Sequence, residues 1–332
     1  MKLLSIILPT YNRLQYLKVT LPIIKNQIQR NSEDVELVIC NNASTDGTVE
    51  YLNSLPESER FFRLVDYSEY VPVSESICRS ASNSRSKYLL LWGDDDIPSP
   101  MMIDTILLYL REYPDTSCLV FNRIQGNMAT ECYMNNMKVY DKKYREQIKF
   151  YTSSNDFIKD HYQDMGFLSV DVISTECWKE GVKHLNEKYI GYEFLAVLLY
   201  GIIGKSCLYL NFPICIQRLV RRPEYYNEWP IYGFVGMPSL LKDLGEKGIL
   251  SNWKDVWKNY QSNGTSLKTF LPVALTCSTD KKKFKPYYSK ICEFQDSKLR
   301  KSVLWFCIYV LPKWFYPLLQ TVFIGKNYKH LR

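Results

Sequence analysis

Three consecutive aspartates, Asp94, Asp95 and Asp96, are the residues of this sequence most suited to metal chemistry. They follow an apolar run, residues 88–92, from which only Gly93 separates them. Carboxylate oxygens are the ligands that Mg²⁺ and Mn²⁺ prefer, and Mg²⁺ usually combines one or two carboxylates with the phosphates of a substrate. Because Asp is also favoured where a helix begins, the triplet alone fits an acidic helix start as well.

Polar residues also follow two earlier apolar runs. Pro9-Thr10-Tyr11-Asn12 comes after residues 3–8, and Asn41-Asn42 comes after residues 35–40. In an open parallel sheet, ligands bind beyond the carboxyl ends of the strands, so these segments and the triplet would meet at one edge. Asn amides suit a base or a ribose, although Asn is favoured in turns too. The convergence favours a site for a divalent metal and phosphate.

The segments that would position these residues alternate between strand and helix. Strands are predicted at residues 3–8, 35–40, 61–65, 87–92 and 117–121, and helices at 14–28, 48–54, 74–85 and 101–112. Asn12 is well placed to cap the first helix. The alternation predicts an α/β fold whose mainly parallel mixed sheet is flanked by helices. The second half is less regular: it predicts strands at 167–174 and 206–210, a helix at 192–203, and a mostly helical region at 225–300.

Composition limits the class of protein. The 332 residues can form one large domain or two smaller ones. The ten cysteines include no CxxC pair, which is typical of reduced thiols in a cytosolic protein, and three histidines argue against a His-rich metal site. Residues 281–332 contain twelve Lys/Arg and two Asp/Glu, a balance of +10 within a total of +7. The rest of the chain is therefore slightly acidic, which argues against a nucleic-acid groove.

The apolar stretch at residues 303–324 is about as long as a membrane span. Pro312, Lys313 and Pro317 interrupt it, and Trp and Tyr side chains of the kind that favour the headgroup layer are part of it. We therefore predict an element that lies in the membrane interface rather than a span. The alternative is a C-terminal helix that packs on the domain.

The three polar segments, in this order and spacing, resemble those of the family 2 glycosyltransferases of GT-A fold. The matching stretches are residues 8–13, 40–48 and 93–96, and Gln27 matches a Gln that the family often carries in its first helix. The GDDD form and the basic aromatic tail look most like bacterial enzymes of O-antigen or capsule assembly, such as the abequosyltransferases. The resemblance implies a catalytic domain at 1–222, with a nucleotide-sugar half (1–125) and an acceptor half (126–222). A helical extension (223–300) and a membrane-associating tail (301–332) would follow.

The resemblance implies a nucleotide-diphosphate sugar donor and a Mg²⁺ or Mn²⁺ ion. Asp96, together with Asp94, would hold the metal, and Asp94 or Asp95 would lie near the donor sugar or ribose. The nucleotide-sugar site would also include residues at the ends of the first two strands: Pro9, Tyr11, Asn12, Asn41 and Asn42. The family usually has Asp at the last two of these positions, so the contact is neutral here.

The resemblance also implies a catalytic carboxylate and a basic residue for the diphosphate. Glu193, in residues 191–195, would take the place of the general base in a Gly-x-x-Glu-Asp-like motif, with Tyr192 replacing an acidic neighbour. A carboxylate at an apolar helix start is expected to have a raised pKa, although an ordinary helix-start Glu is the alternative. Arg218, Arg221 and Arg222 follow the next strand, where the family often has basic residues near the diphosphate.

Taken together, these features predict an inverting glycosyltransferase that transfers a hexosyl or deoxyhexosyl group to a lipid-linked saccharide for bacterial surface polysaccharide. The protein would be cytoplasmic, held by its tail at the anionic inner face of the cytoplasmic membrane, and would bind no nucleic acid. A sugar nucleotidyltransferase is one alternative, but residues 9–13 lack the glycine-rich loop that such enzymes usually carry after the first strand. The other alternative is a non-catalytic sugar- or lipid-binding scaffold.

Overall fold

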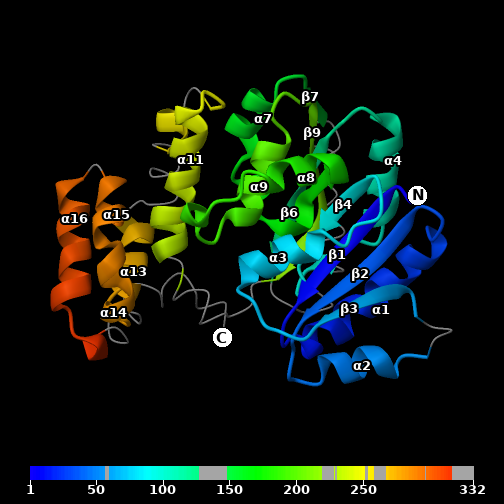
Figure 1. Cartoon of the computed structure of the whole chain (residues 1–332), viewed down its shortest axis with the longest axis horizontal. Coiled ribbons are helices and arrows are strands. Elements are labelled where there is room, and N and C mark those ends of the chain that lie inside the picture. Colours follow the sequence, from blue (N-terminus) through cyan, green and yellow to red (C-terminus); the bar gives the residue numbers. More distant parts are fainter. Residues whose placement is uncertain are drawn as a thin grey trace. The chain divides into compact units, whose positions relative to one another are not determined.

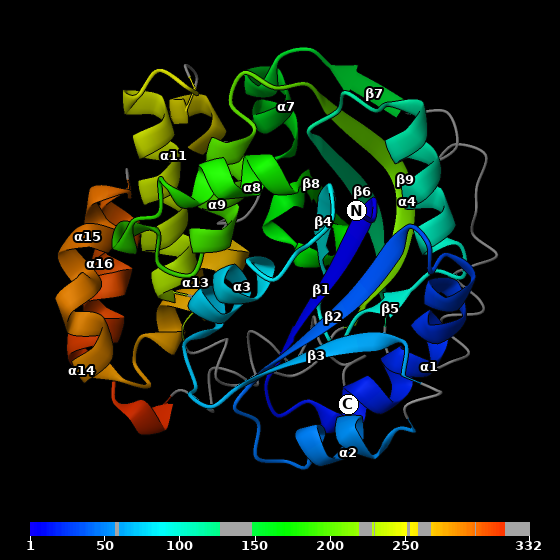
Figure 2. The same ribbon diagram turned by 45° about the vertical axis from the view of Figure 1, so that its right-hand side comes forward.

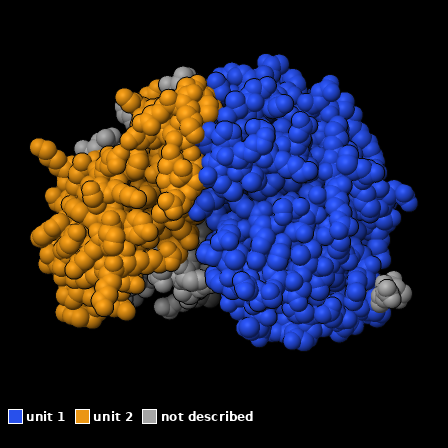
Figure 3. Space-filling view, viewed as in Figure 1, with its two compact units in different colours: residues 1–185, 193–220 blue, residues 186–192, 221–332 orange. Residues whose placement is uncertain are grey.

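The computed structural model of the chain describes residues 1–56, 60–126, 148–218, 228, 230–250, 253–257, 267–295 and 297–315. The chain divides into two compact units (Figure 3). Unit 1 consists of residues 1–185 and 193–220, and unit 2 consists of residues 186–192 and 221–332.

Unit 1 is built on a nine-stranded sheet with the order β3-β2-β1-β4-β8-β6-β9-β5, in which β7 also pairs with β9 (Figures 1 and 2). The strands are β1 Leu4–Thr10, β2 Val35–Asn42, β3 Phe62–Tyr67, β4 Tyr88–Leu91, β5 Ile97–Pro98, β6 Cys118–Gly126, β7 Ile148–Tyr151, β8 Asp171–Ser174 and β9 Cys207–Arg218. The pairings β3-β2, β2-β1, β1-β4 and β6-β9 are parallel. This arrangement confirms the predicted mixed sheet.

The middle of the sheet differs from the prediction in one respect. A strand was expected at residues 167–174, but Leu168–Val170 forms a short 3-10 turn and only Asp171–Ser174 is a strand. This strand, β8, lies antiparallel between β4 and β6. The turn before it places Ser169 in contact with the aspartate segment. The local apolar pattern could not reveal this, because the turn is stabilised by residues far away in the sequence.

Helices flank the sheet as predicted. In unit 1 they are α1 Leu14–Arg30, α2 Thr48–Ser54, α3 Val73–Ala81, α4 Met102–Glu112, α7 Ser154–His161, α8 Thr175–Val182 and α9 Glu193–Gly201. Helix α1 buries Leu17, Leu21 and Ile24 at the expected spacing. Every residue of α9 after Glu193 is buried.

The prediction that Asn12 caps α1 is wrong. Asn12 has a left-handed φ of 52°, and its Oδ1 accepts a hydrogen bond from Thr45 N at 2.7 Å. The amide of Leu14, at the start of α1, instead donates to Asp46 Oδ2 at 3.0 Å. Asp46 also accepts from Thr48 N at 3.1 Å, so it serves the first turns of both α1 and α2. Burial raises the pKa of Asp46, but these hydrogen bonds and that from the Thr48 hydroxyl leave it below its usual value.

Unit 2 is helical in its described residues, as predicted. Its helices are α11 Met237–Glu246, α13 Leu267–Thr276, α14 Lys281–Phe284, α15 Tyr288–Glu293 and α16 Lys298–Trp305. A π-helical turn, Phe306–Val310, continues α16. Leu304, Cys307, Ile308 and Leu311 belong to the core of this unit. Part of the predicted tail therefore packs within the unit. Nowhere in the described ranges is there a helix both long and apolar enough to cross a bilayer.

Candidate active site

The ends of β1, β2 and β4 meet at one edge of the sheet. Thr10 Oγ1, at the end of β1, donates to Asp94 Oδ2 at 2.8 Å. Arg13 Nε lies 4.0 Å from Asp94 Oδ1. The loops after β1 and β2 are joined as well, because Asn12 N donates to Ser44 Oγ at 2.9 Å. The structure therefore brings together the three segments that the sequence singled out.

The three aspartates are almost completely buried, with relative exposures of 7% for Asp94, 4% for Asp95 and 4% for Asp96. Gln27 of α1 forms hydrogen bonds with the segment that follows the aspartates. Its Nε2 donates to Ser99 O at 2.8 Å, and its Oε1 accepts from Ile103 N at 3.1 Å. A buried side-chain amide with both ends bonded fixes the path of the backbone between the aspartates and α4.

Asp96 is held by a residue that sequence reasoning missed. Ser169 Oγ donates to Asp96 Oδ2 at 2.6 Å and accepts from Gly93 N at 2.8 Å. A Cβ on Gly93 would lie 2.7 Å from Asp96 Oδ2. The lack of a side chain at Gly93 lets the Asp96 carboxylate approach closely, and the backbone at Gly93 does not have a positive φ. No local signal in the sequence marks Ser169.

The environment of Asp96 raises its pKa to about 7. Burial is the main cause, and hydrogen bonds from Ser169 and from the Arg218 backbone oppose it. The charge of Asp94 raises the pKa further, whereas the charge of Arg218 lowers it. Near neutral pH this carboxyl group is therefore partly protonated, which relieves part of the repulsion that three adjacent carboxylates would otherwise create.

Arg218, at the end of β9, is buried beside these carboxylates with a relative exposure of 5%. Its guanidinium carbon lies 5.4 Å from the centre of the Tyr16 ring. All three guanidinium nitrogens are buried without a hydrogen-bond partner in the described part of the chain. Burial lowers the pKa of Arg218, and the charges of Asp96 and Asp94 are among the opposing causes. A buried cation with unused donors is costly unless a ligand satisfies it, and phosphate oxygens match its geometry.

Of the other predicted arginines, Arg221 and Arg222 lie outside the described residues.

The amides at the end of β2 bond to β3 and to the loop that follows it. Asn42 Nδ2 donates to Val71 O at 2.8 Å, and Asn42 Oδ1 accepts from Val71 N at 3.1 Å. Asn41 Nδ2 donates to Asp66 Oδ1 at 2.8 Å. Both amides are therefore engaged with the protein, and the predicted contacts of Asn41 and Asn42 with a nucleotide stay predictions.

The loop held by Asn42 carries an exposed aromatic ring. Tyr70 is 56% exposed and lies against Tyr11, which is 41% exposed, with ring centroids 4.7 Å apart. Two accessible rings beside the strand ends suit the stacking of a base. The parts that Pro9 and Asn12 would play in the same subsite also stay predictions.

Glu193 is the first residue of α9. Its Oε2 atom is buried and has no hydrogen-bond partner among the residues described. Glu193 lies near Cys78 of α3, whose pKa is raised to about 12, mainly by burial and secondarily by the charges of Glu193 and Glu75. The carboxylate therefore has an oxygen free to accept a proton or a hydrogen bond.

The aspartates fit a divalent ion that also binds phosphate. Across the described ranges, no group of three or more His, Cys, Asp or Glu side chains forms a complete metal site. Asp94 and Asp96 nonetheless supply two buried carboxylates that interact electrostatically. Two carboxylates plus substrate phosphates are a usual ligand set for Mg²⁺.

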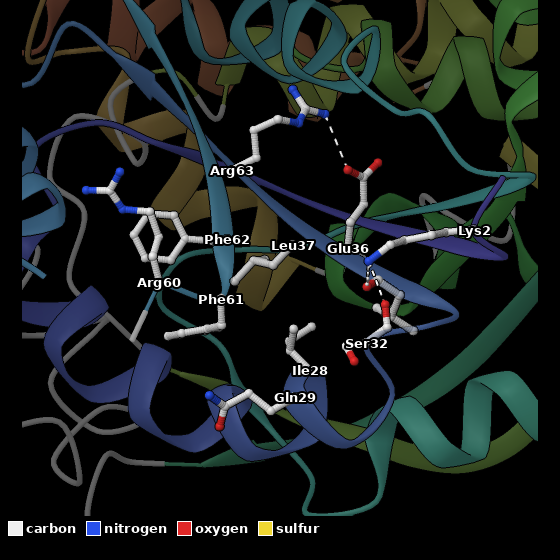
Figure 4. Close-up of a pocket in the computed structure, with 11 residues that line it drawn as sticks. Lys2, Ile28, Gln29, Ser32, Glu36, Leu37, Arg60, Phe61, Phe62 and Arg63 are labelled. Carbon is white, nitrogen blue, oxygen red and sulfur yellow. Dashed lines mark hydrogen bonds and ion pairs between the residues drawn. The ribbon is translucent and has the colours of Figure 1, made fainter. Parts of the chain in front are cut away.

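A pocket of about 470 Å³ lies elsewhere in unit 1 (Figure 4). It is lined by residues at the starts of β2 and β3 and at the C-terminal end of α1, including Ile28, Val35, Leu37, Phe61 and Phe62. The strands of a parallel sheet present their starts and their ends at opposite edges. This pocket contains none of the predicted site residues and is not the candidate active site.

A small test of this geometry is the substitution Gly93→Ala. The added methyl group would displace the Asp96 carboxylate, so we expect a loss of about 1–3 kcal/mol of stability, as for other overpacked sites. We also expect weaker binding of metal and donor. Denaturant unfolding and donor titration would measure the two effects. Gly166→Ala is the matched control, because nothing lies within 4 Å of its added Cβ. Equal behaviour of the two variants would contradict the role assigned to Gly93.

Comparisons with known proteins identify relatives of this sequence. The family model described as "Glycosyl transferase family 2" matches residues 5–171. The abequosyltransferase RfbV of Salmonella typhimurium is 24% identical over 230 residues, which cover 65% of this chain and 66% of RfbV. An uncharacterized glycosyltransferase of Haemophilus influenzae is 26% identical over 110 residues, 33% of each chain. The chain thus spans slightly less than two thirds of the first relative and a third of the second.

Solved structures share the fold. Staphylococcus aureus TarS 1-349 in complex with UDP-GlcNAc has a TM-score of 0.55 at 14% identity, covering 92% of this chain and 87% of that one. Mannosyltransferase PcManGT from Pyrobaculum calidifontis, in complex with GDP-Man and Mn²⁺, has a TM-score of 0.50 at 12% identity, with the same coverage. These likenesses confirm the predicted GT-A fold. Because the family model covers half of the sequence and includes nearly all of β1, β2 and the aspartates, the chain belongs to glycosyl transferase family 2.

Proposed function

We propose that this protein is an inverting, metal-dependent glycosyltransferase of bacterial O-antigen or capsule synthesis. It would move a hexosyl or deoxyhexosyl group from a nucleotide-diphosphate donor to a lipid-linked saccharide. The observation that carries the proposal is the buried Arg218 guanidinium beside the carboxylates of Asp94 and Asp96, whose donors meet no acceptor among the residues that the structure describes. This pairing suits a diphosphate that carries a divalent ion, because the arginine can bind the diphosphate and the carboxylates can bind the ion.

Each residue of this site has a distinct task in the proposed reaction. Asp96 and Asp94 would hold Mg²⁺ or Mn²⁺, which when bound neutralises charge on the departing nucleoside diphosphate. Arg218 would bind the diphosphate oxygens directly. Thr10 and Ser169 orient the two carboxylates through the hydrogen bonds described above. The exposed rings of Tyr11 and Tyr70 would stack on the base. Support for such a donor comes from the UDP-GlcNAc and GDP-Man complexes of the structural neighbours.

Glu193 would act as the general base. Its Oε2, which has no hydrogen-bond partner among the described residues, would take the proton from an acceptor hydroxyl. The oxygen of that hydroxyl would attack the anomeric carbon. The bond to the nucleoside diphosphate breaks on the opposite face of the sugar, so the configuration inverts. No covalent intermediate with the protein is needed, because a single displacement forms one bond and breaks one.

The acceptor and the cellular location are proposed on separate grounds. The likeness to an abequosyltransferase supports a saccharide acceptor of the O-antigen type. The basic, aromatic C-terminal segment supports work at the inner face of the cytoplasmic membrane, where a lipid-linked acceptor would be reached.

A panel of nucleotide sugars tests the proposed activity. The purified protein would be incubated with UDP-, GDP-, CDP- and dTDP-linked sugars, and release of the nucleoside diphosphate would be measured with Mg²⁺, with Mn²⁺ and with EDTA. We expect turnover of a restricted set of donors that stops when EDTA is added. NMR of a transferred product would report the anomeric configuration. Release that is unaffected by EDTA would remove the metal from the proposal, and no binding of any donor would contradict the transferase itself.

A further inference from the structure

The C-terminal part of unit 2 carries an unusually apolar outer surface. We use the name "aromatic face" for the large side chains that α16 and the turns after it expose to solvent. Each is between 37% and 67% exposed: Leu299, Trp305, Phe306, Tyr309, Val310, Trp314 and Phe315. Contiguous exposed apolar groups of this size usually mark an interaction surface.

The same segment is apolar on its inner side too. Leu304, Cys307 and Ile308 are buried in the core of unit 2, and they alternate with the exposed pairs of the aromatic face. A surface helix normally has polar residues opposite its buried stripe. The buried inner side holds the segment in the core of unit 2. Only the exposed side chains can therefore contact another surface, with the segment lying parallel to it. This geometry suits contact with a surface and excludes a span by the described part of the segment.

Lysines lie next to the aromatic face. Residues 281–315 contain nine Lys/Arg and two Asp/Glu. Lys285 Nζ lies 5.5 Å from the centre of the Tyr309 ring, and Lys281 Nζ donates to Tyr309 O at 3.4 Å. Lys313 precedes Trp314 in the last described turn. Glu293, an acidic residue of this segment, is already paired with Lys242 at 2.8 Å.

We propose that the aromatic face docks on an anionic phospholipid bilayer, with its rings in the headgroup layer and the adjacent lysines at the lipid phosphates. Trp and Tyr rings favour this layer, and lysine stems can extend along it while their ammonium groups meet the phosphates. A second copy of the chain is a poorer partner, because it would bring two positive surfaces together. The proposal names the surface that would hold the protein at the inner face of the cytoplasmic membrane, the location proposed above. It does not depend on catalysis.

Vesicle flotation with the full chain tests this surface. The vesicles would be phosphatidylcholine alone or phosphatidylcholine mixed with phosphatidylglycerol, and no donor or acceptor would be present. We expect binding to the mixed vesicles that weakens with salt. Trp305→Ser/Trp314→Ser should reduce the partition coefficient by more than about tenfold. Lys285→Glu/Lys313→Glu should reduce it by at least about thirtyfold for the anionic vesicles only, since each basic residue near such a surface is worth about a factor of five.

Matched variants in unit 1 control for general loss of apolarity and charge. Leu108→Ser replaces a side chain that is 56% exposed on α4, and Lys159→Glu/Lys179→Glu reverses two exposed lysines on α7 and α8. Both should bind vesicles as the wild type does. Quenching of tryptophan fluorescence by brominated lipid gives a second readout, and it should fall in the tryptophan variant.

Three outcomes would overturn the proposal. The first is no binding of the wild type to either kind of vesicle. The second is unchanged binding by the folded tryptophan variant. The third is a tryptophan variant that differs from the wild type in oligomeric state, measured by light scattering, but not in flotation. This result would assign the aromatic face to contact with a second copy of the chain. Donor hydrolysis measured on the same samples separates these outcomes from a failure of the transferase proposal.

Discussion

Asp96→Asn should abolish metal-dependent turnover and at the same time make the metal-free protein more stable at pH 8. The loss of activity follows because an amide is a much weaker ligand for Mg²⁺ or Mn²⁺ than a carboxylate. The gain in stability follows from the raised pKa of Asp96, about 7, because ionising this buried group in the folded state is unfavourable. An amide removes that penalty and can still receive hydrogen bonds.

The sign of the effect can be followed through the pH range. The unfolded chain releases this proton near pH 4, but the folded protein retains it until about pH 7. The contribution of Asp96 to the free energy of unfolding is therefore greatest below pH 4 and is lost as the pH rises to 7. At about 1.4 kcal/mol per pKa unit, the total is on the order of a few kcal/mol. Denaturant unfolding at pH 5 and pH 8 should show this slope in the wild type and a smaller slope in the variant.

A surface carboxylate provides the control for this experiment. Asp34 pairs with Arg111 on the surface, where both side chains are more than a third exposed, so Asp34→Asn should change stability by no more than about 1 kcal/mol. Adding Mn²⁺ and donor should stabilise the wild type and the Asp34 variant but not the Asp96 variant. Full metal-dependent transfer by Asp96→Asn would show that another group holds the ion.

Glu193→Gln should reduce kcat by about 100- to 10,000-fold while leaving donor binding intact. This range is the usual contribution of a general base, and the variant keeps the size of the side chain but cannot take a proton. Calorimetric titration with the donor and steady-state transfer to an acceptor would separate the two effects. Glu193→Asp should recover part of the rate, because it restores a carboxylate at a greater distance.

Glu176 offers a control for an ordinary glutamate at a helix start. It lies in the first turn of α8 as Glu193 lies in the first turn of α9. Glu176→Gln should leave turnover unchanged and have at most a small effect on stability. If the two glutamine variants behave alike, Glu193 has only a structural role, and the base must be sought in another residue.

The sequence was informative where a short stretch carries its own signal. The apolar runs before Pro9, Asn41 and Gly93 predicted β1, β2 and β4, and the rule that ligands bind at strand ends predicted their meeting. The periodicity of α1 was equally clear. These features depend on neighbours within a few residues, so the order of side chains along the chain determines them.

The sequence was less informative where a contact joins distant segments. Ser169 follows the aspartates by 73 positions and is one serine among many, so its bond to Asp96 could be found only in the folded chain. The sequence alone could not single out Arg218, because its burial against Tyr16 and the carboxylates exists only in the folded chain. The cap of α1 was assigned to the adjacent Asn12, whereas Asp46 in the next loop provides it.

The hydrogen bonds to Asp96 have a consequence for the order in which the site is made during translation. When the first 126 residues have emerged from the ribosome, β1, β2 and β4 are all available to pair, and the aspartates are already present. Neither Ser169 nor Arg218, whose groups fix the Asp96 carboxylate, has yet been synthesised. The nascent chain can therefore form a partial sheet in which the proposed donor site is unfinished. Competence to bind nucleotide sugar should appear only after β9 has emerged and joined β6.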